Sequence, residues 1–149
     1  MNIVDAINNA KIKLNMYNIQ SSKLDSEILL SAAIKKDRKF IILNPDYDID
    51  KNSYNYFENL IDERSNGKPV AYLIKKKDFW NYEFKVQKGV LIPRPETELI
   101  IEEVLKITKN KKKFKILDIG VGTGCILLSI LNEKKDFYGI GIDVSKKCI

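Results

Sequence analysis

The segment from Phe114 to Asp143 constrains the fold of this 149-residue chain more than any other. It reads FKILDIGVGTGCILLSILNEKKDFYGIGID, an apolar run, three glycines, an amphipathic run and a second apolar run that ends at an acid. This order is typical of a strand, a turn, a helix and a strand at the head of an α/β domain. We therefore expect parallel strands at Phe114–Ile119 and Phe137–Ile142, of the kind buried on both faces of a sheet. The helix between them should turn one apolar face to the sheet, made by Ile126, Leu127, Ile130 and Leu131.

The glycines of this segment predict a ligand-binding turn. Glycine tolerates positive φ and lets a ligand lie against the backbone, close to the free N–H groups that begin the following helix. Asp143 ends the second strand, where a carboxylate can accept hydrogen bonds from both hydroxyls of a ribose. The candidate ligand contacts are therefore Asp143 and the loop residues Gly120, Val121, Gly122, Thr123 and Gly124.

The spacing of the glycines narrows the choice of ligand. The dinucleotide pattern GxGxxG is not met, because its third glycine position is Cys125. Asp118 precedes the loop, and a carboxylate there suits an ammonium group and is a poor neighbour for a pyrophosphate. S-adenosyl-L-methionine carries an ammonium, a sulfonium and a ribose, and no phosphate. We therefore predict S-adenosyl-L-methionine as the cofactor, with Asp118 as a further contact.

The residues before Gly67 predict four short helices. Ser21-Ser22, Asp37 and Asp50 are suited to begin the second, third and fourth, and Asn44-Pro45 should end the third. The inward-facing residues of the four are, in order, Ile3, Ile7, Ala10 and Leu14; Leu24, Ile28, Leu29, Ala32 and Ala33; Phe40, Ile41 and Leu43; and Tyr54, Phe57, Leu60 and Ile61. Helices this short are stable only when packed together, so we expect a small helical bundle.

From Asp78 onward the apolar residues no longer follow the spacing of a helix. Phe79, Trp80, Tyr82, Phe84 and Val86 are aromatic or β-branched and surround Asn81, a turn residue, which predicts a β-hairpin.

The next segment, Leu91–Glu98, reads LIPRPETE. Pro95 suits the first turn of a helix. The negative charges of Glu96 and Glu98 would stabilise the positive, N-terminal end of that helix. Two prolines around Arg94 hold the backbone extended. We interpret this stiff segment as a wall of the ligand site, with Arg94, Glu96 and Thr97 as further candidate contacts.

Composition excludes several kinds of site. The chain has no histidine, which removes histidine acid–base catalysis and histidine metal sites. Its two cysteines, Cys125 and Cys148, are too far apart for a CxxC pair, so we expect no metal and a buried, reduced thiol at Cys125. The net charge is +6, but the lysines are scattered, so we expect no direct nucleic-acid partner. With no apolar run of membrane-spanning length and no secretion signal, we expect a cytoplasmic monomer without membrane contact.

Five segments together carry a resemblance to a known family. They are GKPVAYL (67–73), DFWNYEFKV (78–86), VLIPRPETE (90–98), DIGVGTGC (118–125) and GIDVS (141–145), and LDSEILL (24–30) also fits. The chain resembles the bacterial protein-(glutamine-N5) methyltransferases that modify peptide chain release factors. The family usually has a glycine near Lys75 and another near Asn81, and this chain has neither.

The resemblance implies a fold, a cofactor and a partner. The expected fold is an α+β chain in two parts: an N-terminal helical bundle, a β-hairpin linker and the first βαβ unit of a Rossmann-like methyltransferase domain. The expected domains are 1–74 for substrate docking, 75–112 for the hairpin linker and leading helix, and 113–149 for the incomplete start of the methyltransferase domain. The implied reaction is S-adenosylmethionine-dependent N5-methylation of the glutamine in the Gly-Gly-Gln loop of release factors.

The acceptor side of this reaction is not represented in the sequence. The family's Asn-Pro-Pro-Tyr motif lies downstream of Asp143, so we name no catalytic residue and expect the chain alone to be inactive. Two other functions stay open at this point. One is a methyltransferase for RNA bases, and the other is a non-catalytic module that binds a release factor or the ribosome.

Overall fold

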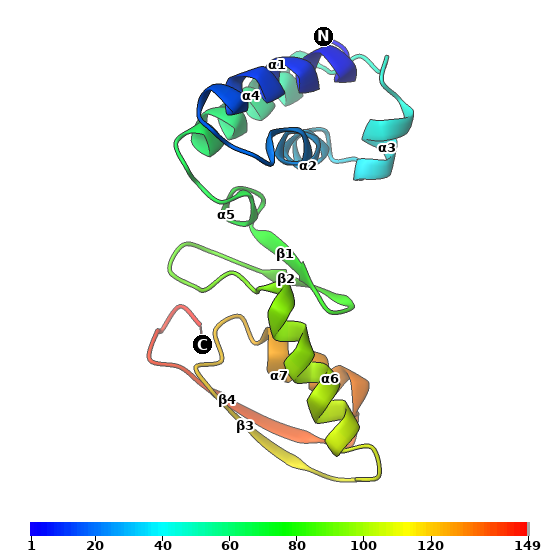
Figure 1. The fold of residues 1–149 in the computed structure, drawn as a ribbon, viewed down its shortest axis with the longest axis vertical. Coiled ribbons are helices and arrows are strands. Elements are labelled where there is room, and N and C mark those ends of the chain that lie inside the picture. The colour runs from blue at the N-terminus through cyan, green and yellow to red at the C-terminus, as the bar shows by residue number, and fades with distance from the viewer. Residues whose placement is uncertain (149) are drawn as a thin grey trace. The chain divides into compact units, whose positions relative to one another are not determined.

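A computed structural model describes residues 1–148, and the chain divides into two compact units between Ile74 and Lys75. The first unit is a helical bundle, and the second contains a β-hairpin followed by a βαβ unit (Figure 1). This confirms the expected α+β arrangement. No helix among the described residues is both long enough and apolar enough to cross a membrane.

The first unit consists of five helices, of which four pack around α2. They are α1 (Ile3–Met16), α2 (Ser22–Ile34), α3 (Arg38–Leu43), α4 (Lys51–Ser65) and α5 (Val70–Ile74). Helix α2 contacts each of the other four (Figure 1). Side chains of Asn2, Asp37 and Asp50 accept hydrogen bonds from the first-turn N–H groups of α1, α3 and α4, as expected of N-cap residues. The short helix α5 was not predicted.

The buried surface of α2 is wider than the sequence predicted. Leu24, expected inside, is 43% exposed, whereas Leu30 is fully buried. Because helices surround α2 on several sides, its buried surface exceeds one apolar stripe. The predicted side-chain cap by Ser21 is also wrong: its hydroxyl donates instead to the carboxylate of Asp25 at 2.8 Å.

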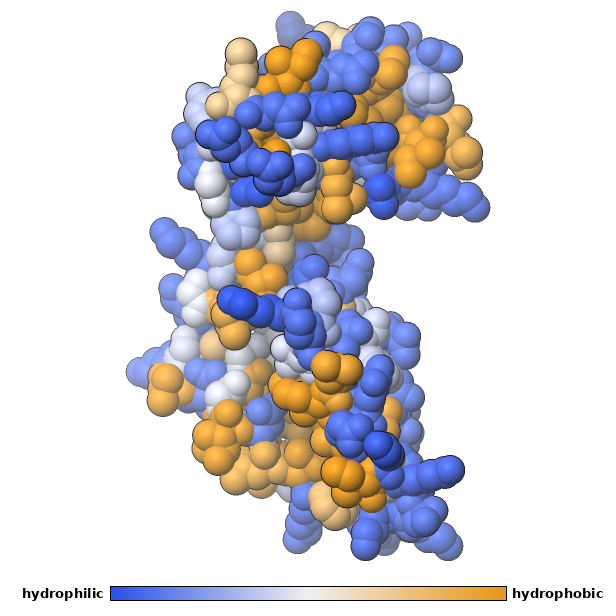
Figure 2. Space-filling model, in the orientation of Figure 1, coloured by the Kyte–Doolittle hydropathy of each residue, from blue (hydrophilic) through white to orange (hydrophobic). Residues whose placement is uncertain are grey.

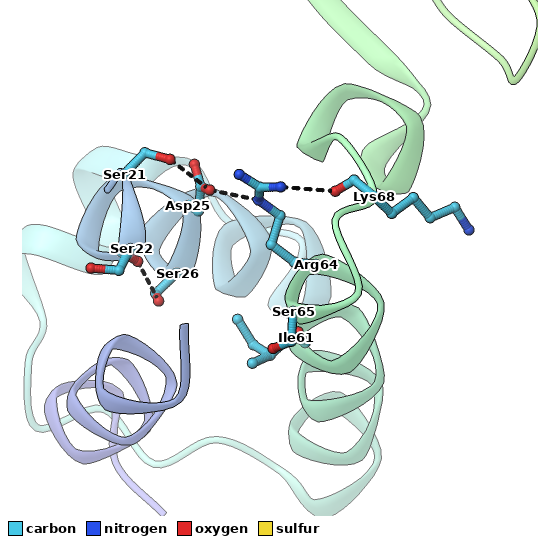
Figure 3. A network of polar contacts seen from close by, with 8 residues as sticks. All are labelled: Ser21, Ser22, Asp25, Ser26, Ile61, Arg64, Ser65 and Lys68. Carbon is cyan, nitrogen blue, oxygen red and sulfur yellow. Dashed lines mark hydrogen bonds and ion pairs between the residues drawn. The ribbon is translucent and has the colours of Figure 1, made fainter. Parts of the chain in front are cut away.

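Two acids on α2 are buried and paired. Asp25 accepts from Arg64 of α4 at 2.7 Å, and Arg64 also donates to the carbonyl of Lys68 (Figure 3). Glu27 accepts from Arg38 of α3 at 2.8 Å. A buried carboxylate is tolerated only when it is paired and hydrogen-bonded, so these contacts explain how a central helix can carry acids.

The second unit begins with a hairpin of β1 (Lys76–Phe79) and β2 (Tyr82–Lys85), paired antiparallel as predicted. Its turn places Trp80 at φ 55°, and Lys75, just before β1, has φ 59°. Both values lie in the left-handed region that glycine adopts most readily. The family that this chain resembles usually has a glycine near Lys75 and another near Asn81. These positions coincide with, or lie next to, residues whose side chains strain the backbone here.

The hairpin shares a core with the helices of this unit. After the short 3₁₀ helix η1 (Pro95–Thr97) come α6 (Glu98–Ile107) and, further along, α7 (Cys125–Glu133). Trp80 donates its backbone N–H to Glu98 at 2.7 Å and its indole N–H to Glu133 at 2.8 Å. These bonds tie the hairpin turn to both helices. The buried core residues are Phe79, Phe84, Ile101, Cys125, Ile130 and Phe137.

The βαβ unit joins β3 (Lys115–Ile119) and β4 (Tyr138–Ile142), which pair in parallel, through α7. The strands have the apolar pattern of strands buried in a parallel sheet, but only one face of this two-stranded sheet is covered. Leu117 and Ile119 are 58% and 75% exposed, and Ile140 and Ile142 are about half exposed. An apolar patch lies over these strands (Figure 2). The reason is that α7 covers the alternate residues only, which leaves the opposite face of the two-stranded sheet bare.

Candidate functional site

The glycine loop lies between β3 and α7 and has the backbone geometry that its sequence predicts. Gly120, Gly122 and Gly124 have φ values of 83°, 56° and 78°. A side chain at any of them would be strained, and at Gly124 an added Cβ would also lie 3.0 Å from Leu128. Around Gly120 an added Cβ would meet nothing within 4 Å. The backbone of the loop is therefore open where a ligand could approach it.

Asp143, at the carboxyl end of β4, holds this loop. Its Oδ2 accepts a hydrogen bond from the N–H of Gly122 at 2.9 Å, and its Oδ1 accepts from the N–H of Ser145 at 2.8 Å. These backbone hydrogen bonds keep the pKa of the Asp143 carboxyl below its usual value. The carboxylate is therefore ionised at neutral pH, and each oxygen keeps a lone pair for a ligand donor.

The second strand is fixed against the loop by close packing. A Cβ on Gly141 would lie 2.6 Å from Cγ2 of Val121, and a Cβ on Gly139 would lie 2.6 Å from Leu127. Only glycine fits at either position without a shift of the neighbours. These two glycines were not among the predicted site residues, although their alternation in YGIGI is the signal that a helix and a loop approach β4 closely.

Asp118 carries an acceptor that has no partner. Its Oδ2 is buried and forms no hydrogen bond within the described residues, and the same is true of the Thr123 hydroxyl. Burial raises the pKa of the Asp118 carboxyl, the nearby charge of Asp143 raises it further, and the backbone N–H of Leu127 partly offsets both. Buried polar atoms without partners are uncommon, and these two lie at the loop where a ligand donor is expected, whereas a third, Ser129 Oγ, lies within α7.

The remaining candidate residues, Arg94, Glu96 and Thr97, lie outside the glycine loop. Arg94 and Glu96 are exposed and Thr97 is half-buried, at the entry to α6. The backbone of Arg94 is extended (φ −106°, ψ 138°), as the flanking prolines predict. None of the three lines the cavity next to the glycine loop. Their role as ligand contacts stays a prediction.

That cavity has a volume of about 490 Å³ and includes residues that the sequence did not indicate. Gly122 and Thr123 form its loop side, and Lys85 and Val90 come from the hairpin and the segment after it. Lys147 reaches the same segment, donating to the carbonyl of Lys88 at 3.4 Å. This lining could not be found from sequence, because it joins segments about sixty positions apart with no shared motif.

The described residues contain no group of three or more Cys, Asp or Glu side chains placed to hold a metal ion. Cys125 and Cys148 are free thiols. Cys125 is buried at the start of α7, and burial raises the pKa of its thiol, so it is protonated at neutral pH. This agrees with a packing role for Cys125.

The fit to S-adenosylmethionine can be judged from these contacts. A cofactor with an ammonium group would supply the donor that the buried Asp118 oxygen lacks, and its ribose hydroxyls would find the ionised Asp143 carboxylate. Gly120 is exposed, with open space where a side chain would stand, so the loop backbone is accessible there. The residues present therefore fit this cofactor.

Comparisons with known proteins agree with this picture. Residues 5–74 match the family model of the PrmC N-terminal domain. Two relatives named release factor glutamine methyltransferase align with all of the chain: one from Clostridium acetobutylicum is 39% identical over 149 residues, and one from Buchnera aphidicola subsp. Baizongia pistaciae is 41% identical over 155. A third of that name, from Caulobacter vibrioides, is 34% identical.

The chain covers 52%, 53% and 52% of these three relatives, so it spans about half their length. Along its whole length the chain is thus similar to the release factor glutamine methyltransferases, and its first part is similar to the PrmC N-terminal domain.

Proposed function

We propose that this chain provides the methyl-donor side of a release factor glutamine methyltransferase and binds S-adenosyl-L-methionine at the glycine loop. The observation that carries the proposal is the bond between Asp143 and the N–H of Gly122, which joins the acid after β4 to a loop of three left-handed glycines. The names of the relatives support a methyl transfer to release factors.

The proposed residue roles follow from the contacts. Gly120 to Gly124 present the backbone to the cofactor, Asp143 accepts hydrogen bonds from its ribose, and Asp118 accepts from its ammonium group. Once bound, S-adenosylmethionine supplies an electrophilic methyl group on a sulfonium. The proposed acceptor is the side-chain amide of the glutamine in the Gly-Gly-Gln loop. Because an amide nitrogen is a poor nucleophile, we expect catalysis by positioning, which orients that nitrogen toward the methyl group. Residues 1–74 are proposed to help dock the release factor.

Calorimetric titration of the purified chain tests the cofactor. S-adenosylmethionine should bind with one site per chain, and NADH, whose pyrophosphate would lie near Asp118, should not bind. Binding of NADH with no binding of S-adenosylmethionine would overturn the proposal.

The partner is tested separately by passing the chain over an immobilised release factor. We expect retention, and no retention on an unrelated protein of equal net charge. Equal retention on both surfaces would show that charge alone draws the chain to its partner.

A further inference from the structure

The cavity beside the glycine loop is strongly basic. Three lysines, Lys75, Lys85 and Lys147, line it together with Gly122 and Thr123, and no acid does. The whole net charge of +6 falls from Lys75 onward, where sixteen Lys and Arg stand against ten Asp and Glu, and the residues before it are balanced. The cavity is thus a local concentration of positive charge within the charged part of the chain.

Within residues 1–148, these three lysines are not neutralised by ion pairs. The described ion pairs of this unit join Lys76 to Glu83 at 2.6 Å and Lys106 to Glu103 at 3.3 Å. Lys147 donates only to a neutral carbonyl. Cations that line a concave surface without counter-charges attract an anionic group of a ligand. Lysine, a compact charge on a flexible stem, suits a small anion that is held without fixed bidentate geometry.

The backbone around the cavity keeps two of the lysines near each other. The N–H of Val86, which follows Lys85, donates to the carbonyl of Lys75 at 3.1 Å. Gln87 donates its side-chain amide to the carbonyl of Lys147 at 3.1 Å, which draws the segment after β4 to the end of the hairpin. The lysines therefore come together through backbone and side-chain contacts among three separate segments.

We propose that Lys75, Lys85 and Lys147 form the subsite for the carboxylate of the amino-acid end of S-adenosylmethionine. This inference rests on the proposed function. An amino acid is a zwitterion, and the loop has both matching charges: an acid with an unpartnered oxygen at Asp118, and a basic cavity against Gly122 and Thr123. A phosphate would match the lysines but not Asp118.

Two ligands that differ only at this end test the subsite. S-adenosylhomocysteine has the carboxylate, and 5′-methylthioadenosine lacks the whole amino-acid group. In calorimetry on the full chain, Lys75→Gln and Lys85→Gln should each weaken S-adenosylhomocysteine binding roughly two- to fivefold, the range of a partly screened ion pair. Binding of 5′-methylthioadenosine should stay unchanged. The matched control is Lys76→Gln, since Lys76 pairs with Glu83 and does not line the cavity.

Salt gives a second readout that does not depend on substitution. Raising the KCl concentration should weaken S-adenosylhomocysteine binding more than 5′-methylthioadenosine binding. Equal losses for the two ligands, or no loss for either in the Lys75 and Lys85 variants, would overturn the subsite while leaving the cofactor assignment intact. If the unmodified chain binds neither ligand, the proposed function fails and the subsite falls with it.

Discussion

Asp143 and Gly122 are joined by a hydrogen bond of 2.9 Å from the loop N–H to the carboxylate, across twenty-one positions of the chain. This bond sets the loop against the carboxyl end of β4. It also places an ionised group beside the backbone that is expected to receive the cofactor.

The first prediction concerns this carboxylate. Asp143→Ala should weaken S-adenosylmethionine binding about tenfold or more, because both the loop contact and the proposed ribose contact are charge-assisted hydrogen bonds. The measurement is calorimetry on the full chain. Asp136→Ala, an exposed acid before β4, serves as the control and should bind normally. Unchanged affinity in the Asp143 variant would remove this residue from the site.

The second prediction concerns pH. Because the folded-state pKa of Asp118 is raised, chiefly by burial, its charge opposes folding at neutral pH. This penalty shrinks as pH falls through the folded pKa and is gone below the unfolded-state pKa. Asp118→Asn should therefore raise the melting temperature of the ligand-free chain at pH 7, with a gain that shrinks under acid conditions.

The lowered pKa of Asp143 has the opposite sign. Its contribution to stability is complete above the unfolded-state value and is lost as pH falls through the folded one. Melting curves from pH 7 down to pH 3, with Asp136→Asn as control, separate the two effects. An Asp118→Asn gain that persists unchanged at pH 3 would contradict the assignment.

The third prediction concerns the packing of β4 against the loop. Gly141→Ala should destabilise the chain by about 1–3 kcal/mol, because the new methyl would lie 2.6 Å from Val121. Adding Val121→Ala removes the side-chain atoms nearest to it and should recover much of the loss. Denaturant unfolding of the two single variants and the double variant measures the coupling. Strictly additive effects would show that the clash is not the cause.

The fourth prediction concerns the ion pair in the helical unit. Asp25 and Arg64 have side chains only 8% and 19% exposed, so Asp25→Ala leaves a nearly buried guanidinium unpaired and should cost about 3 kcal/mol. The double change Asp25→Leu with Arg64→Met should cost less than this single change. Lys13→Ala, which breaks the exposed pair with Asp62, should cost less than about 1 kcal/mol. Equal costs for the two single variants would refute the distinction.

The fifth prediction concerns Lys75. Its φ of 59° is strained for a side chain, so Lys75→Gly should raise the free energy of unfolding by about 0.5 kcal/mol after the flexibility of glycine is subtracted. Lys77→Gly, inside β1, should lower it by a similar amount. If Lys75→Gly destabilises as much as Lys77→Gly, the strain at position 75 is absent.

Much of the local structure could be predicted because it depends on short sequence patterns. The alternation of apolar residues and glycines between Phe114 and Asp143 predicted both strands and the helix between them, and Asp37 and Asp50 marked the helix starts. It could not be predicted that Leu30 is buried on α2 and Leu24 is exposed, because this depends on how many helices surround α2.

The candidate site also has a part that the sequence predicts and a part that it does not. The loop and Asp143 follow from spacing, and their hydrogen bond connects neighbouring strand ends. The basic cavity depends on Lys75, Lys85 and Lys147, which come from three segments and belong to no motif. In the sequence they look like ordinary surface lysines, and Lys75 and Lys147 stand in short lysine runs. Only tertiary contacts bring them together.

The helical unit has a consequence for the order of folding during synthesis. All buried residues of its core lie between Ile3 and Leu73, and residues 1–74 form a compact unit of their own. A ribosome releases the N-terminal segment first, and domains generally fold as units while synthesis continues. The helical unit can therefore complete its core while the glycine loop is still unmade, and the loop is built on a chain whose first part has already folded.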